Sequence, residues 1–186
     1  GGVMLIRAHG MHPSILRDLN KKKVKVVDAT CPIVKRTQEI VANLVENGYQ
    51  VVIVGEKEHA EVEALSGYAN DKAVVVKNME DVEALPSYVK IGVVAQSTLT
   101  FDTFKETVSP LVNKGAEIRI YNTVCNSAKR MQEAALKLAK NVDLMIVVGG
   151  KNSANTRHLT ELCGRQGVKT HHIEHMKELK KPWFNK

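Results

Sequence analysis

Short runs of apolar residues alternate along the chain with longer amphipathic stretches. The short runs are rich in β-branched residues and predict strands that are buried on both faces, as in a parallel sheet. The longer stretches predict helices, and glycine or proline marks several of their ends. The predicted strands are 3–6, 24–27, 51–54, 73–76, 91–95, 117–120, 144–148 and 168–172. The predicted helices are 13–19, 32–47, one from about 60, 80–84, 100–113, 128–140 and 152–164.

This alternation is typical of an α/β protein. We therefore expect three-layer αβα domains with mainly parallel sheets, because a helix after each strand covers one of the two sheet faces. In such folds a ligand binds beyond the carboxyl ends of the strands. Polar residues that directly follow a predicted strand are the first candidates for function.

The sequence also repeats itself without gaps. The stretch that begins at Cys31 recurs 94 residues later, at Cys125. The recurring residues are Lys35 and Arg36 with Lys129 and Arg130, Gln38 and Glu39 with Gln132 and Glu133, and the run 51–55 with 145–149. We interpret the two stretches as copies of one domain, each with a cysteine after its first strand.

A third copy is indicated by the first strand. Its end, residues 7–10, resembles the strand end at 96–98 that closes the first complete copy. We therefore predict the tail of a first domain at 1–27, a complete middle domain at 28–121 and an incomplete third domain at 122–186. Three copies around a pseudo-threefold axis would bring three cysteines together, and three thiolates can hold an iron–sulfur cluster.

Composition limits the class of protein. Apolar residues make up 44% and charged residues 25% of the chain, as in ordinary globular domains. No apolar run approaches the roughly 18 residues of a membrane span, and no signal-peptide pattern opens the chain. The simplest expectation is a cytoplasmic protein without a membrane partner.

The net charge bears on the kind of binding partner, and the number and spacing of the cysteines bear on what they can form. The net charge of +7 indicates an anionic partner. Nucleic acid is not expected, because the lysines are scattered and aromatic residues, at 4%, are too few for base stacking. The three cysteines, Cys31, Cys125 and Cys163, form no CxxC pair, and their odd number argues against a disulfide framework.

Six motifs, taken in order and spacing, resemble the 4-hydroxy-3-methylbut-2-enyl diphosphate reductases. They are Arg-Ala-His-Gly at 7–10, Asp-Ala-Thr-Cys-Pro at 28–32, His-Ala-Glu-Val-Glu at 59–63, Gln-Ser-Thr-Leu at 96–99, Asn-Thr-Val-Cys at 122–125 and Val-Val-Gly-Gly-Lys-Asn-Ser-Ala-Asn-Thr at 147–156. The resemblance covers the whole chain. It implies three similar α/β domains around a [4Fe–4S] cluster held by three cysteines, and reductive removal of a hydroxyl group from an allylic diphosphate in isoprenoid biosynthesis. Ferredoxin or flavodoxin is the implied electron donor.

The resemblance also implies roles for single residues. Cys31 and Cys125 correspond to two of the three cluster ligands, and Glu61 corresponds to the residue that delivers protons toward the substrate hydroxyl. His9, His59, Ser97, Ser153 and Asn155 correspond to residues that bind the substrate or its diphosphate. These roles agree with chemistry, because a buried diphosphate needs several hydrogen-bond donors and a buried carboxyl can act as an acid.

The sequence departs from the family at some positions. The family often has threonine where Ser97 stands, which keeps a hydroxyl group, and serine where Ala154 stands, so one diphosphate contact is not expected. The family's first cysteine and an early histidine are expected upstream of Gly1, and its last serine-bearing loop beyond Lys186. An inactive fragment of the reductase is therefore one alternative, and a non-redox α/β module that binds a phosphorylated metabolite is another.

Each candidate residue also has a purely structural interpretation. Cys31 and Cys125 would pack well as buried thiols, His9 would suit a turn, and His59, Glu61 and Ser153 would suit the first turn of a helix. Cys163 has no counterpart in the repeat and shares an apolar helical spacing with Leu159 and Leu162. We expect Cys163 to be a core residue and not the missing ligand.

Overall fold

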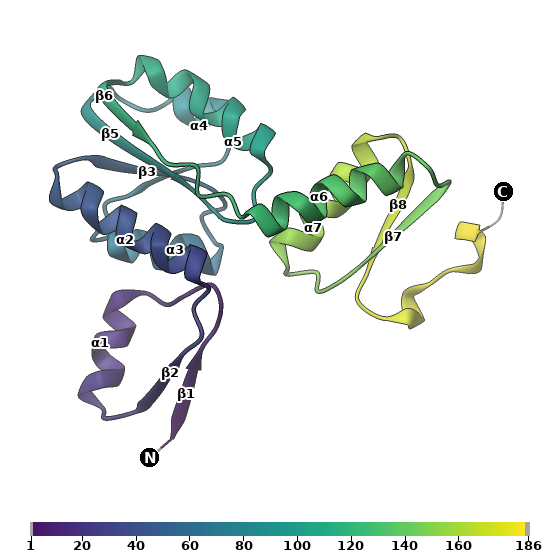
Figure 1. The fold of residues 1–186 in the computed structure, drawn as a ribbon, viewed down its shortest axis with the longest axis horizontal. Helices are drawn as coiled ribbons and strands as arrows, with labels where there is room; N and C mark the ends of the chain where they lie inside the picture. The colour runs from purple at the N-terminus through teal and green to yellow at the C-terminus, as the bar shows by residue number, and fades with distance from the viewer. Residues whose placement is uncertain (1, 185–186) are drawn as a thin grey trace. The chain divides into compact units, whose positions relative to one another are not determined.

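The chain forms two compact units in the computed structural model, which describes residues 2–184 (Figure 1). Unit 1 runs to Ser97 and resumes at 101–123, and unit 2 comprises 98–100 and the chain from Val124 onward.

Unit 1 is built on a parallel sheet with the strand order β4-β3-β5-β6. These strands are β3 (Gln50–Val54), β4 (Val74–Val76), β5 (Tyr88–Ala95) and β6 (Gly115–Ile120). Helices α2 (Pro32–Glu46) and α3 (Ala60–Tyr68) cover one face, and α4 (Met79–Glu83) and α5 (Phe101–Val108) cover the other (Figure 1). Because both faces are covered, the carboxyl-terminal parts of the central strands are apolar, and Val52, Ile53, Val93 and Val94 are fully buried.

The first strands of unit 1 form a smaller parallel pair. β1 (Val3–Ile6) and β2 (Lys25–Asp28) pair in register from Val3 with Lys25 to Ile6 with Asp28, and α1 (Pro13–Lys21) connects them. Helix α1 packs against α3. The pairing continues past the strands, because the Cys31 N–H donates to the Ala8 carbonyl at 3.0 Å.

Unit 2 contains α6 (Asn126–Ala139), β7 (Leu144–Val148), α7 (Ala154–Arg165) and β8 (Lys169–Ile173), followed by 3₁₀ turns at Met176–Glu178 and Lys181–Phe184. Strands β7 and β8 are parallel. Cys163 is fully buried in a cluster with Ala139 and Met145, which confirms that it is a core residue.

The sequence repeat is also a repeat of elements. Corresponding points lie 94 residues apart: α2 begins at Pro32 and α6 at Asn126, β3 ends at Val54 and β7 at Val148, and α3 begins at Ala60 and α7 at Ala154. The α/β class with parallel strands is confirmed. The domain boundaries at 27/28 and 121/122 and the pseudo-threefold arrangement stay predictions.

One predicted helix is shorter than expected. The helix predicted at 100–113 ends at Val108 and continues as a 3₁₀ helix over Ser109–Asn113, because Pro110 lacks the N–H that an α-helical turn needs there. No helix among residues 2–184 is long and apolar enough to cross a membrane.

Candidate functional site

In unit 1 the predicted site residues follow the carboxyl ends of four strands. His9 follows β1, Cys31 follows β2, His59 follows β3 and Ser97 follows β5. Glu61 is the second residue of α3. The sheet topology therefore places the candidates at the edge where parallel sheets bind their ligands.

His9 and His59 meet beyond the strands. Their ring centroids are 5.2 Å apart and their planes stand at 83°, so the rings meet edge to face. His59 is the N-cap of α3, and its Nδ1 accepts a hydrogen bond from the Glu61 N–H at 3.2 Å. Burial and the neighbouring Arg7 lower the pKa of His9. The capping interpretation of His59 is thus confirmed, and it leaves the ring at a helix N-terminus, where anions are favoured.

Glu61 is buried, with 1% of its surface exposed. One carboxylate oxygen accepts from the Ser97 N–H and the other from the Ser97 hydroxyl, both at 2.7 Å. Burial raises the pKa of Glu61, and the two hydrogen bonds from Ser97 oppose this effect only in part. A raised pKa favours the protonated carboxyl group, which can deliver its proton through the half-buried Ser97 hydroxyl.

The loop that carries Cys31 is fixed by Asp28. The Asp28 Oδ1 accepts from the Thr30 N–H at 2.9 Å and from the Thr30 hydroxyl at 2.5 Å, while Oδ2 lies 2.6 Å from the Lys35 ammonium. The Lys35 and Thr30 hydrogen bonds lower the pKa of Asp28 to about 2. Cys31 itself is the N-cap of α2, is half-buried and caps no helix N–H with its sulfur.

Unit 2 places its candidates in matching positions. Cys125 is the half-buried N-cap of α6, as Cys31 is of α2. Ser153 is the N-cap of α7 and accepts from the Thr156 N–H at 3.3 Å. The Asn155 amide nitrogen lies 3.4 Å from the Met131 sulfur, and its oxygen is buried without a hydrogen-bond partner among the described residues. That oxygen can accept a further hydrogen bond.

Sequence analysis missed two polar residues that hold the site. Gln96 is fully buried, and its side-chain oxygen accepts from the Glu56 N–H at 2.9 Å, which fixes the turn between β3 and His59. The buried Thr123 hydroxyl donates to the Ala95 carbonyl at 2.7 Å and accepts from the Ala95 N–H at 2.8 Å, just before Ser97. A glutamine at the end of an apolar run was the available signal for Gln96.

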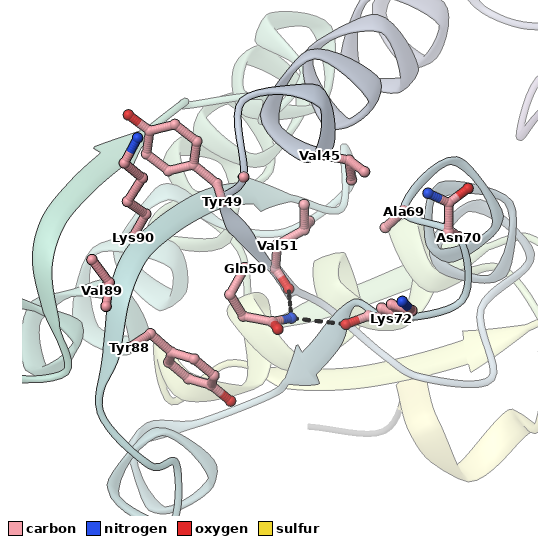
Figure 2. A pocket seen from close by; sticks show the side chains of 11 residues that line it. Val45, Tyr49, Gln50, Val51, Ala69, Asn70, Lys72, Tyr88, Val89 and Lys90 are labelled. Carbon is pink, nitrogen blue, oxygen red and sulfur yellow. Dashed lines mark hydrogen bonds between the residues drawn. The ribbon is translucent and has the colours of Figure 1, made fainter.

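Two pockets of unit 1 lie away from the predicted site residues. One of about 380 Å³ lies at the amino ends of β3 and β5 (Figure 2). There Gln50 donates to the carbonyls of Val51 and Lys72 at 3.1 and 2.8 Å, so its amide N–H groups are used within the protein. Another, of about 510 Å³, is lined by residues of α4, α5 and the 3₁₀ helix that follows. Neither pocket includes a predicted site residue, so neither supports the predicted chemistry.

The surroundings of Cys31 and Cys125 bear on whether each can be a ligand of an iron–sulfur cluster. Among residues 2–184 no group of three His, Cys, Asp or Glu side chains is arranged to hold a metal ion. Cys31 and Cys125 are each half-buried free thiols at the N-cap of a helix, and the sulfur of neither caps a helix N–H. Each therefore fits the role of a single ligand to an iron–sulfur cluster.

Comparison with known proteins places this geometry in a family. The family model described as "LytB protein" matches residues 1–186. The 4-hydroxy-3-methylbut-2-enyl diphosphate reductases of Pelobacter propionicus and Geobacter metallireducens are 47% and 46% identical to the chain over 98% of its length. The chain spans 65% of the length of these relatives.

Solved structures agree. One is the structure of an (E)-4-hydroxy-3-methyl-but-2-enyl diphosphate reductase, described as the terminal enzyme of the non-mevalonate pathway. It is 43% identical to this chain with a TM-score of 0.66, and the match covers 98% of this chain and 66% of the chain in that structure. The E-1-hydroxy-2-methyl-but-2-enyl-4-diphosphate reductase from Plasmodium falciparum is 29% identical with a TM-score of 0.92, over 98% of this chain and 58% of its own. The chain therefore belongs to the LytB protein family.

Proposed function

We propose that this chain is part of a 4-hydroxy-3-methylbut-2-enyl diphosphate reductase, which converts its substrate to isopentenyl and dimethylallyl diphosphates. The names of the relatives support this activity. The observation that carries it is the buried Glu61, bonded twice to Ser97 at the strand edge that also bears His9 and His59. A buried acid beside two imidazoles suits a reaction that must bind an anion and deliver protons.

The histidines are the proposed diphosphate ligands in unit 1. A diphosphate is costly to desolvate, so it needs several hydrogen-bond donors in one place. His59, at the N-terminus of α3, supplies a ring N–H in the field of the helix dipole, and His9 lies against it. Ser97, Ser153 and Asn155 are proposed as further contacts to the substrate, because Ser97 follows β5 and the other two lie at the N-terminus of α7, the helix after β7.

Glu61 is the proposed proton donor. Removing a hydroxyl group as water and replacing it with hydrogen breaks one C–O bond, forms one C–H bond and consumes two electrons and two protons. The Ser97 hydroxyl donates to the ionised Glu61 at 2.7 Å. When Glu61 is protonated this bond reverses, so the Ser97 oxygen accepts the Glu61 proton while the hydroxyl gives its own proton to the departing oxygen. The raised pKa of Glu61 favours the protonated form that this step requires.

Cys31 and Cys125 are the proposed ligands of a [4Fe–4S] cluster. The third thiolate is proposed to come from the part of the relatives that this chain does not span. When bound, the cluster supplies the electrons and an iron that can take the substrate oxygen. Ferredoxin or flavodoxin is the proposed source of those electrons.

Turnover tests the proposal directly. In a chain extended to the length of the relatives and reconstituted without oxygen, we expect reduction of the diphosphate substrate with a chemical electron donor. Glu61→Gln keeps the shape of the side chain but has no proton to deliver, so turnover should fall by about 10²–10⁴. Glu63→Gln changes an exposed carboxylate on the same helix and should leave turnover unchanged.

The outcome separates the alternatives. If the extended, iron-loaded chain turns over and Glu61→Gln is as active as Glu63→Gln, the assignment of Glu61 is wrong. If the extended chain binds the diphosphate but never reduces it, the non-redox binding module is the better account.

A further inference from the structure

The loop between β1 and α1 touches both helices that flank the strand edge. Gly10 has a φ of 78°, in the left-handed region that favours glycine, and a side chain there would collide with the buried Gln38 of α2. Two residues further on, His12 reaches α3. The same loop carries His9, so the position of the His9 ring depends on how this loop is held.

His12 is held through both of its ring nitrogens. Nδ1 accepts from the Ser14 N–H at 3.2 Å, which makes His12 the N-cap of α1. Nε2 lies 2.8 Å from the Asp71 carboxylate, in the turn that follows α3. An acceptor at Nδ1 and a carboxylate at Nε2 require the tautomer with its proton on Nε2. The two bonds therefore fix the plane of the ring, although Asp71 is exposed and its bond alone would be weak.

The ring of His12 lies in a gap that only glycine leaves open. Gly67 is the penultimate residue of α3, and a Cβ atom there would collide with the His12 ring and with the Pro13 ring. At the other end of the same helix, His59 contacts His9. One loop thus contacts α3 at both ends, with His12 against Gly67 and His9 against His59.

We propose that His12 and Gly67 are positioning residues for His9. With the His12 ring seated on Gly67, the loop is held along α3, and the His9 ring is brought against the His59 ring at the helix N-terminus. The importance of that histidine pair for the substrate rests on the proposed function. The positioning itself does not, because it is a statement about the two rings in the ligand-free chain.

The first test uses the 186-residue chain and the ring signals of its histidines in NMR spectra. We expect a nuclear Overhauser effect between the His9 and His59 rings, which should be lost in Gly67→Ala. Gly164→Ala is the matched control, because Gly164 is also the penultimate residue of its helix and a Cβ there meets nothing within 4 Å. The control should keep the contact.

A double-mutant cycle separates the collision with the His12 ring from any effect that alanine at position 67 has on α3 itself. His12→Ala should also lose the contact between His9 and His59, and the effect of Gly67→Ala should then be smaller, because of the two rings at Gly67 only that of Pro13 remains. If Gly67→Ala does not fold, the comparison of His12→Ala with the native chain carries the test. Retention of the ring contact in either variant would overturn the proposal, and so would an effect of Gly67→Ala that is equally large when residue 12 is alanine.

A second test uses the extended, iron-loaded enzyme. There Gly67→Ala should raise KM about tenfold, the equivalent of one hydrogen bond to the substrate, with kcat little changed. An unchanged KM together with a lost ring contact would show that His9 does not bind substrate, which counts against the proposed function and not against the positioning. An unchanged ring contact counts against the positioning alone.

Discussion

Glu61 occupies a position where an acidic residue is common, the first turn of a helix. Glu63, two residues later, is exposed, as such acids usually are, whereas Glu61 is buried against Ser97. The difference arises because Glu61 points toward the end of β5, 36 residues further along the chain. At the scale of single residues, function is thus decided by burial and by partners that are distant in the sequence.

Thr123 illustrates how a buried hydroxyl supports the site. Its Oγ1 serves both the N–H and the carbonyl of Ala95, so Thr123→Val leaves a buried N–H without a partner. We expect the free energy of unfolding to fall by about 1–3 kcal/mol. Thr37→Val is the matched control, because Thr37 is as buried but bonds only the Ile33 carbonyl, within its own helix, and its loss should cost less than about 1 kcal/mol. Urea unfolding measures both; equal losses would show that the Ala95 bonds contribute nothing special.

At the scale of elements, most of the fold could be predicted because its boundaries are marked locally. Pro32 begins a helix, Gly48 follows its end with a φ of 77°, and continuous apolar runs mark the central strands. The first residues of β5 were missed because Val89 is 77% exposed and its neighbours are polar, so no apolar run marks them. The candidate residues themselves came from the resemblance to the reductases, and the general rule for α/β folds agrees with it, because most of them follow a strand end.

The contacts that complete the site could not be predicted in the same way. His12 and Asp71 lie 59 residues apart, and neither stands in a repeated position or directly after a strand. The burial of Glu61 depends on α3 packing against the end of β5, which no local pattern records. Local patterns predict where chemistry is located, whereas the pairing of side chains depends on the tertiary structure.

The loop between β2 and α2 should make stability depend on pH. The pKa of Asp28 is about 2 in the folded chain, below its unfolded value of about 3.9. The charged form is therefore favoured by folding, and its contribution is present above pH 4 and is lost as the pH falls toward 2. Because Asp28 is partly exposed, we expect Asp28→Asn to lower the free energy of unfolding by only about 1 kcal/mol at pH 6.

Urea unfolding at pH 6, 4 and 2 checks this expectation. The difference between the native chain and Asp28→Asn should shrink below pH 4 and be small at pH 2, where Asp28 is largely protonated in the unfolded chain and partly protonated in the folded one. Asp18→Asn is the control, because Asp18 and Lys21 form an exposed ion pair at 3.4 Å within one helix, and its loss should change little at any pH. A difference for Asp28→Asn that persists at pH 2 would assign the effect to packing and not to charge.

At the scale of the whole molecule, the repeat gives Cys31 and Cys125 equivalent positions. In each copy of the repeat a strand ends in a polar loop, a cysteine is the N-cap of the next helix, and a second capped helix follows the next strand. Two such positions 94 residues apart supply two thiolates, one fewer than the three that the proposed cluster needs. The chain spans 65% of the length of its relatives. The amount of iron that we expect a chain of the relatives' length to bind therefore differs from the amount expected for these 186 residues.

Iron binding should differ between the 186-residue chain and a chain of the relatives' length. We expect a chain extended to the length of the relatives to bind about four iron atoms after anaerobic reconstitution, as a [4Fe–4S] cluster requires, and the 186-residue chain to bind fewer. Cys125→Ser should abolish the gain without unfolding unit 2, because serine is a better N-cap than cysteine. Cys163→Ser, in the core, should keep the iron and lose stability. Iron and sulfide analysis beside thermal unfolding measures both effects. If iron uptake is unchanged in Cys125→Ser, or is lost in Cys163→Ser, the repeated cysteines do not hold the cluster. The redox assignment would then be wrong as well.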